Sequence, residues 1–125
     1  MIPSRWSLGH RAETVVIDYL RTRDYRILAA NLWLNRFEID IVAQQHGLIA
    51  VVEVRTRGKH SYETGFSSIS PRKRSRLLQA TEQLWSTTLC HMPEVQRVRI
   101  DVASVSFERS GVSLEYDEGA LWFNE

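Results

Sequence analysis

The sequence predicts a single α/β domain whose elements follow in the order αβββαββ. Apolar residues recur at helical spacing in two segments, one near the N-terminus and one after Ser70-Pro71, and Ile- and Val-rich runs typical of strands lie between and after them. At 125 residues with 43% hydrophobic content, the chain is long enough for one core and too short for two typical domains. We therefore expect one domain over residues 1–125.

The first helix is expected to start at a cap formed by Ser4 or Ser7 and to run to about Arg23. Glu13 falls on the flank of its apolar stripe, from which its carboxylate can reach the edge of a sheet. An ordinary surface glutamate is the alternative. The residues expected to form the buried stripe are Ala12, Val15, Val16, Tyr19 and Leu20.

Three strands are expected next, the first over residues 25–34 and the others forming a hairpin over residues 37–45 and 48–55. The hairpin turn is His46-Gly47, where we expect glycine to take the positive φ that tight turns require. Pairing Gln45 with Leu48 across this turn sets Asp40 directly opposite Glu53 on one face.

Opposed residues on antiparallel strands hold their Cβ atoms about 4.5–5.5 Å apart, so two carboxylates there repel each other. The strand period of two adds Glu38 beside Asp40, and Arg55 and Arg57 beside Glu53, so three acids and two guanidinium groups are expected on one surface. A salt-bridge ladder involving Arg55 is one interpretation. However, Ile49 and Val51 share the acidic face and Leu48, Ala50, Val52 and Val54 line the opposite one, so this strand is apolar on both faces. Acids at the end of a buried strand usually have a metal or a tight ion pair as partner.

The second helix is expected to begin at Ser70-Pro71, with serine as cap and proline in the first helical position. Its first turn carries Arg72, Lys73 and Arg74, although the helix dipole favours negative charge there. An anionic partner such as phosphate would relieve this conflict. Tolerance of a small surface penalty is the alternative.

The C-terminal part is expected to form two more strands after Met92-Pro93 ends the second helix. Val98, Ile100 and Val102 alternate along the first of them, and a bulge near Ala103 or Ser104 would explain why the apolar phase then changes. The turn at Ser110-Gly111 should lead into a short edge strand over residues 112–116.

The string EID at residues 38–40, followed thirteen residues after its Asp by the Glu of EVRTR, resembles the YraN-like proteins. These are small bacterial members of the restriction-endonuclease-like PD-(D/E)xK nuclease superfamily. The resemblance implies a restriction-endonuclease-like fold, a mixed β-sheet flanked by helices. It spans most of the chain and takes in further residues: Gly9, Ala12, Glu13, Asn31, Gly65, Lys73 and Asp101. We interpret Asp101 as structural, because it falls on the face opposite Val98 and Ile100.

The resemblance also implies Mg²⁺- or Mn²⁺-dependent cleavage of DNA phosphodiester bonds, with branched or damaged DNA among the expected substrates. The superfamily's catalytic residues match Asp40, Glu53, Arg55 and Glu13 here. Asp40 and Glu53 would hold the metal, because hard cations take carboxylate oxygens, and Glu13 or Glu38 would act through water or by orienting the site.

One departure from the superfamily is Arg55, which stands where the catalytic lysine is usual. A guanidinium offsets phosphate charge but stays protonated near neutral pH, so it cannot act as a base. Three alternatives follow: catalysis needs no neutral amine, Lys59 or Lys73 supplies it, or activity is lost. The last would leave a nucleic-acid-binding or scaffold protein that keeps the nuclease fold.

The expected partner is a nucleic acid, most simply DNA, although a net charge of +1 does not point to one by itself. The argument rests on where the positive charges cluster: Arg55, Arg57, Lys59, His60, Arg72, Lys73, Arg74 and Arg76. The residues expected to contact nucleic acid are Arg57, Lys59, Tyr62, Arg72, Lys73 and Arg74. A solvated loop and helix start is the alternative. A lone cysteine, Cys90, and the absence of any long apolar run favour a cytoplasmic protein without a membrane segment. The oligomeric state stays open, a homodimer included.

Overall fold

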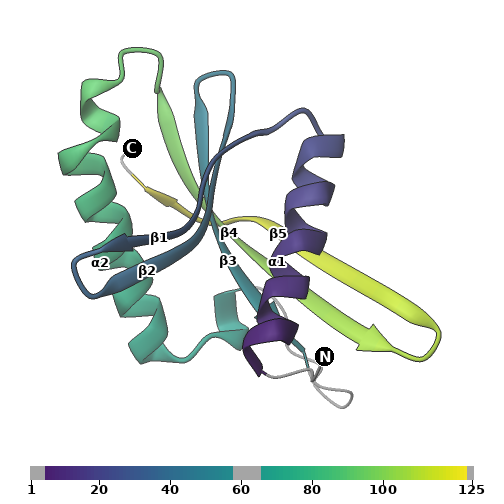
Figure 1. Cartoon of the computed structure of the whole chain (residues 1–125). Coiled ribbons are helices and arrows are strands. Elements are labelled where there is room, and N and C mark those ends of the chain that lie inside the picture. Colours follow the sequence, from purple (N-terminus) through teal and green to yellow (C-terminus); the bar gives the residue numbers. More distant parts are fainter. Residues whose placement is uncertain (1–4, 58–65, 124–125) are drawn as a thin grey trace.

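The computed structural model describes residues 5–57 and 66–123, and it shows two helices on opposite sides of a five-stranded mixed sheet (Figure 1). The predicted order αβββαββ is confirmed. Two short 3₁₀ segments, η1 (Phe66–Ser68) and η2 (Leu89–His91), flank the second helix. The main elements are α1 (Arg5–Thr22), β1 (Arg26–Leu34), β2 (Phe37–Gln45), β3 (Leu48–Thr56), α2 (Pro71–Thr87), β4 (Arg97–Glu108) and β5 (Gly111–Phe123).

The sheet order β1-β2-β3-β4-β5 follows the chain. The first three strands form the antiparallel meander that the sequence predicts, and β5 is antiparallel to β4. Only β3 and β4 are parallel, and α2 makes the crossover between them. In the part of the chain described, neither helix combines the length and apolar character needed to cross a membrane.

Each helix covers its own apolar cluster. On α1, Ala12, Val16 and Leu20 are buried, with Val15 and Tyr19 at the flanks, as the helical spacing predicts. The buried residues packed beneath α1 include Ile41, Ala43, Ala50, Val52, Ala103 and Val105. On the other face, α2 contributes Leu77, Ala80 and Leu84, which pack over Ile39, Val42, Ile49, Val51, Val98 and Ile100. β3 and β4 are therefore buried on both faces, which agrees with a central position for residues 48–54.

Both predicted helices differ from expectation at one end. Because α1 begins at Arg5, Ser7 lies inside the helix, and the other proposed cap, Ser4, lies outside the described residues. Ser70 caps α2 as predicted, since its hydroxyl accepts the Lys73 N–H at 3.2 Å. α2 ends at Thr87, and the 3₁₀ turn η2 carries the chain toward Met92-Pro93.

The hairpin register is confirmed from Gln45↔Leu48 to Ile41↔Val52. The role expected of Gly47 is wrong, because His46 takes the left-handed conformation with a φ of 55° and Gly47 does not. Gly47 is instead required by the close approach of the segment before β4. A Cβ there would lie 3.0 Å from the Gln96 side chain, and the Gly47 carbonyl accepts the N–H groups of Gln96 and Arg97. The glycine thus lets the segment before β4 approach the hairpin closely.

The predicted bulge at Ala103 or Ser104 is also wrong. β4 pairs with β3 without interruption from Leu48↔Arg97 to Thr56↔Val105, and the irregularity lies in β5, between the partners of Ile100 and Val102. The apolar phase changes along β4 because its first half packs under α2 and its second half under α1. β5 is also longer than the predicted edge strand of residues 112–116.

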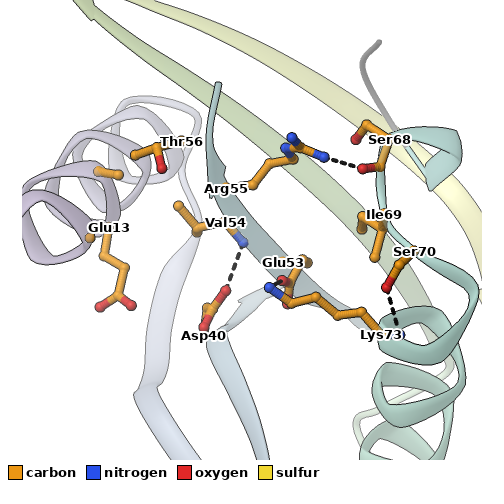
Figure 2. A pocket seen from close by; sticks show the side chains of 12 residues that line it. Glu13, Asp40, Glu53, Val54, Arg55, Thr56, Ser68, Ile69, Ser70 and Lys73 are labelled. Atoms are coloured by element: carbon orange, nitrogen blue, oxygen red, sulfur yellow. Dashed lines mark hydrogen bonds and ion pairs between the residues drawn. The ribbon is translucent and has the colours of Figure 1, made fainter. Parts of the chain in front are cut away.

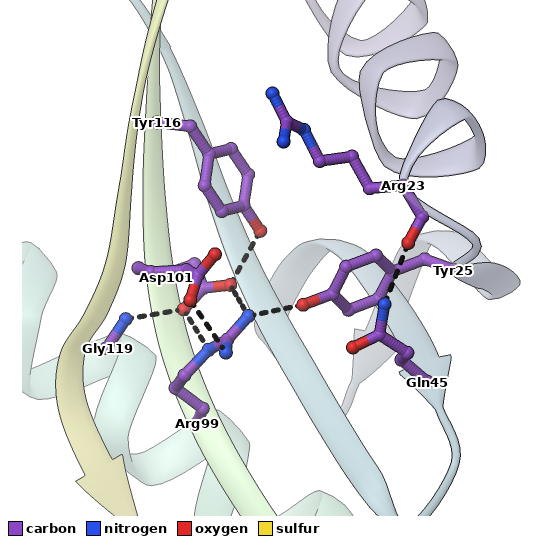
Figure 3. A network of polar contacts seen from close by, with 8 residues as sticks. Arg23, Tyr25, Gln45, Arg99, Asp101, Tyr116 and Gly119 are labelled. Atoms are coloured by element: carbon purple, nitrogen blue, oxygen red, sulfur yellow. Dashed lines mark hydrogen bonds and ion pairs between the residues drawn. The ribbon is translucent and has the colours of Figure 1, made fainter.

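Asp101 belongs to a buried polar network that joins β4, β5 and the start of β1 (Figure 3). Its side chain is fully buried and accepts two hydrogen bonds from Arg99, at 2.7 and 2.9 Å. Tyr116 donates its hydroxyl at 2.6 Å and Gly119 its N–H at 2.8 Å, while Arg99 also donates to the Tyr25 hydroxyl. Buried charges must be paired and hydrogen-bonded, and Asp101 has both kinds of partner. These contacts agree with the structural role that the sequence analysis gave to Asp101.

Candidate active site

A pocket of about 480 Å³ opens at the end of β3, between α1 and the first turn of α2 (Figure 2). Three acids, Glu13, Asp40 and Glu53, and two cations, Arg55 and Lys73, line it. The remaining lining residues are small or apolar for the most part: Gly9, Ala12, Val54, Thr56, Ser68, Ile69 and Ser70. The four predicted catalytic residues, Glu13, Asp40, Glu53 and Arg55, are therefore brought to one cavity, together with Lys73, a predicted nucleic-acid contact.

Asp40 is held by the backbone of the neighbouring strand. Paired residues of β2 and β3 run only as far as Ile41↔Val52, one pair short of the predicted opposition between Asp40 and Glu53. Beyond that pair, Asp40 Oδ2 accepts the Val54 N–H at 2.8 Å. The carboxylate thus binds the backbone of β3 where the ladder stops, which fixes it at the pocket.

Charge crowding defines the electrostatics of this pocket. Burial, followed by the neighbouring carboxylates Glu53, Glu13 and Glu38, raises the pKa of Asp40 to about 8, against the opposing effect of the Val54 hydrogen bond. Glu53 is itself only 4% exposed. Two buried carboxylates next to each other are unfavourable when both are ionised, so this pair requires a proton or a cation.

Lys73 supplies one cation. Its Nζ lies 2.8 Å from Glu53 Oε2, although the lysine side chain is 58% exposed (Figure 2). Burial lowers the pKa of Lys73, but Glu53 and Asp40 outweigh that effect and the pKa is raised overall. Of the two lysines proposed to replace the usual one, Lys73 lies in the pocket as an ammonium, and Lys59 lies outside the described residues.

Glu13 is fixed from β1. Asn31 Nδ2 donates to Glu13 Oε1 at 2.9 Å, and His10 Nδ1 lies 3.7 Å from the same oxygen. Asn31 has a φ of 54° in the middle of β1, a conformation that asparagine tolerates better than most residues. The sequence analysis included Asn31 among the residues of the family resemblance but did not predict that it orients Glu13.

Arg55 and Arg57 separate at the end of β3. Arg55 donates from Nη1 to the Ser68 carbonyl and so ties the strand to the segment before α2. Arg57 instead pairs with Glu115 at 2.6 Å and contacts Ser106, which places it outside the pocket. The expectation that both guanidinium groups converge on the acids is therefore wrong for Arg57. Tyr62, like Lys59, falls outside the described residues.

A second cavity of about 420 Å³ continues from the first and shares Asp40, Glu53, Ser70 and Lys73 with it. Glu38 lies here, exposed, and its pKa is raised by burial and by Glu13 and Glu53. The lining adds Trp33, Arg36, Phe37, Arg72, Arg76 and Leu77. Arg74, a predicted nucleic-acid contact, lines neither cavity.

The sequence analysis did not name Trp33, Arg36 or Arg76 as site residues, although it counted Arg76 in the cluster of positive charges. One signal was present for Arg76, since Arg72 and Arg76 share a helical face at the i,i+4 spacing. Nothing local marks Arg36 or Trp33, because the approach of the β1–β2 turn to α2 is a tertiary feature.

The carboxylates of Asp40 and Glu53 fit a hard divalent cation, which would relieve the repulsion that raises the pKa of Asp40. Within residues 5–57 and 66–123, no group of three or more His, Cys, Asp or Glu side chains is placed to hold a metal. Two carboxylates could hold an ion such as Mg²⁺, which usually binds through one or two carboxylates and keeps several waters or substrate phosphates as its other ligands.

Comparison with known proteins identifies the family. A family model described as "Uncharacterised protein family UPF0102" matches residues 12–105. UPF0102 protein sce2912 of Sorangium cellulosum (strain So ce56) is 44% identical over 108 residues, which cover 86% of this chain and 75% of the relative. UPF0102 protein DehaBAV1_0707 of Dehalococcoides mccartyi is 32% identical over 122 residues, 97% of this chain and 98% of the relative. A UPF0102 protein of Thermosynechococcus vestitus, tll1737, is 34% identical over 113 residues. The matched region takes in Glu13, Asp40, Glu53 and Lys73. Because the family model matches most of the chain and these relatives are 32–44% identical to it, the chain belongs to the uncharacterised protein family UPF0102, the YraN family.

Proposed function

We propose that this protein is a Mg²⁺- or Mn²⁺-dependent nuclease that hydrolyses DNA phosphodiester bonds in the pocket of Asp40 and Glu53. The observation that carries the proposal is the meeting of these two carboxylates at the end of β3, where burial and Glu53 raise the pKa of Asp40. Such strongly perturbed groups in a cavity are typical of functional sites. The resemblance of EID and EVRTR to the PD-(D/E)xK superfamily supports the same assignment.

Asp40 and Glu53 would hold the divalent ion, and Glu13 and Glu38 would orient it or act through water. A divalent ion bound here would polarise the scissile phosphate and lower the pKa of an attacking water. Asn31 keeps Glu13 turned toward this pocket through its 2.9 Å hydrogen bond. The Val54 N–H keeps one oxygen of Asp40 in place.

Two cations would stabilise the negative charge that develops on the phosphate. Lys73 carries a raised pKa, so it acts as an ammonium and not as a base, and its exposed side chain can reach a phosphate in the pocket. Arg55 holds the Ser68 carbonyl through Nη1, and its buried Nε has no hydrogen-bond partner among the described residues. The contribution proposed for Arg55 is the positive charge of its guanidinium at the wall of the pocket.

The test is a cleavage assay with Mg²⁺ or Mn²⁺ on linear, nicked, single-stranded and branched DNA. Wild type should cleave at least one form, with branched or damaged structures as the proposed substrates, and Asp40→Asn should abolish cleavage. DNA binding by Asp40→Asn should be retained or improved, because a negative charge near phosphate is removed. The matched control is Asp18→Asn, an exposed acid on α1 that does not line the pocket. Inactivity of the wild type on every form would overturn the proposal.

A second candidate is a nucleic-acid-binding or scaffold protein without cleavage. The ion pair between Lys73 and Glu53 favours it, because an ammonium already neutralises one of the two proposed metal ligands. Tight DNA binding by an inactive wild type would decide for this candidate. Under either candidate we place the protein in the cytoplasm, where nucleic acid is available and the exposed thiol of Cys90 stays reduced.

A further inference from the structure

One surface beside the proposed active site has features that catalysis alone does not explain. Trp33, near the end of β1, is 61% exposed, and it pairs directly across the strands with Glu38. Among the residues whose side-chain exposure the structure describes, the only other large apolar side chain with comparable exposure is Val112, on β5. Trp33 lies on the wall of the second cavity, the one that also contains Asp40 and Glu53.

Three arginines line the second cavity together with this indole. Arg72 and Arg76 lie one turn apart on α2, Arg36 lies in the β1–β2 turn, and the three also line an adjoining groove. Like charges at i,i+4 destabilise a helix, and within residues 5–57 and 66–123 neither Arg72 nor Arg76 forms an ion pair with a carboxylate. Repulsion between these arginines destabilises the isolated protein slightly, and a bound polyanion would relieve it.

The groove continues into the candidate site. Arg36, Arg72 and Arg76 line both the groove, which has no acidic residue among the described residues of its lining, and the second cavity, which also contains Glu38, Asp40 and Glu53. A chain of phosphates that follows the arginines therefore leads to Asp40 and Glu53. The positive charge of the groove and its continuity with the candidate site point to a nucleic-acid strand as the occupant.

The exposed indole decides between paired and unpaired strands. Bases in a duplex are stacked on one another and offer no free face to a side chain at the rim. An unpaired base does, and stacking on an aromatic side chain is a common way to bind single strands without regard to sequence. Ser75 and Gln79, polar residues on the same face of α2, complete a groove that suits a backbone more than an apolar partner.

We propose that Trp33, Arg36, Arg72 and Arg76 form a binding site for an unpaired nucleic-acid strand, in which a base stacks on Trp33 and the adjoining phosphates contact the arginines. This rests on the proposed function only for its orientation, since the strand would enter the nuclease pocket at Asp40 and Glu53. The substrate class becomes a DNA with an unpaired segment, such as a flap, a frayed end or a junction arm.

The experiment measures binding without cleavage, by fluorescence anisotropy of a labelled oligothymidylate and of a blunt duplex of the same length. All variants carry Asp40→Asn, so that binding is read independently of hydrolysis. Trp33→Ala should weaken single-strand binding by about 5- to 150-fold, the range that the loss of one stacked base gives, and leave duplex binding within about twofold. Trp33→Phe should restore most of the affinity. Val112→Ala, the other exposed apolar residue, is the matched control and should change neither.

Salt dependence separates the two parts of the site. Arg72→Ala and Arg76→Ala should each make the slope of log affinity against log salt shallower by about 0.7 for the single strand, because one phosphate contact is lost. Trp33→Ala should leave that slope unchanged, since stacking releases no counterions.

Three outcomes would overturn the inference: equal losses for single strand and duplex, no loss in Trp33→Ala, or a protein dimer that Trp33→Ala dissociates while oligonucleotide binding is absent. The two proposals fail separately. Cleavage without Trp33-dependent binding removes this inference, and Trp33-dependent binding by an inactive wild type removes the nuclease.

Discussion

The ammonium of Lys73 lies 2.8 Å from Glu53 Oε2, so the first turn of α2 contacts the buried end of β3. The EVRTR string has Arg55 where the superfamily has its lysine. A lysine from a different element, Lys73 of α2, contacts the Glu53 carboxylate instead. The cation paired with Glu53 thus comes from α2, the helix that forms the crossover between the parallel strands β3 and β4.

Removing that cation should affect cleavage more than folding. Lys73→Gln should lower single-turnover cleavage by about 10²- to 10³-fold, the usual effect of losing one donor to transition-state charge. Lys73→Arg should keep a measurable part of the activity, because charge is retained. Arg109→Gln, an exposed cation at the β4–β5 turn, is the control. Unchanged rates in Lys73→Gln would show that the lysine only neutralises Glu53.

Arg55→Lys should retain or raise metal-dependent cleavage, because it restores the superfamily's usual cation. It should also cost about 1 kcal/mol of stability, since the hydrogen bond to the Ser68 carbonyl is lost or weakened. Denaturant unfolding and the cleavage rate measure the two effects. Arg57→Lys, which alters a cation paired with Glu115, should leave cleavage unchanged. A large loss of cleavage in Arg55→Lys alone would show that the planar guanidinium itself is needed.

The pH dependence of the metal-free protein follows from Asp40. Its folded-state pKa, about 8, lies above the ordinary value of 3.8, so the folded state holds a proton that the unfolded state releases. That proton stabilises the fold below the ordinary value, and the contribution is lost as pH rises toward 8. Asp40→Asn, which stays neutral, should therefore raise the free energy of unfolding at pH 8 by on the order of 2 kcal/mol and raise the melting temperature with it. Near pH 4 the substitution should change both quantities little.

Thermal melts from pH 4 to 9 in chelator measure this effect, with Asp18→Asn as the exposed control. An equal gain at both ends of the range would mean that Asp40→Asn acts by packing and not by charge.

Divalent ions should offset the loss of stability that ionisation of Asp40 causes at high pH. Mn²⁺ at a hundred times its dissociation constant would add about 2.7 kcal/mol of stability if it binds only the folded state. The melting temperature should rise in the wild type and stay constant in Asp40→Asn and in Glu53→Gln. A shift that survives both substitutions would place the ion at another site.

The buried network around Asp101 should be required for stability and not for chemistry. Asp101→Asn should cost about 3–5 kcal/mol, because Arg99 loses its buried counter-charge and keeps only the exposed Glu118. Glu118→Gln removes an exposed partner of the same arginine and should cost less than about 1 kcal/mol. Urea unfolding of the two variants measures the difference. Comparable small losses would contradict the structural role assigned to Asp101.

Local patterns in the sequence determined the elements, their order and the hairpin register. Helical spacing predicted the stripe of Ala12, Val16 and Leu20, and the short connection at His46-Gly47 fixed which residues of β2 and β3 pair. The same patterns predicted that Asp40 and Glu53 meet. All of these depend on residues close together in the chain, where periodicity and turn length leave few alternatives.

Tertiary structure decided what surrounds those carboxylates. The phase change along β4 was mistaken for a bulge because the sequence does not show that α1 and α2 cover different halves of the same strand. Arg57 turns to Glu115 because β5 lies beside β4, and Lys73 reaches Glu53 because α2 starts over the end of β3. The groove of Trp33, Arg36, Arg72 and Arg76 likewise exists only where the β1–β2 turn meets α2. Such contacts join residues far apart in the chain, so they follow from the packing of whole elements and leave no local pattern in the sequence.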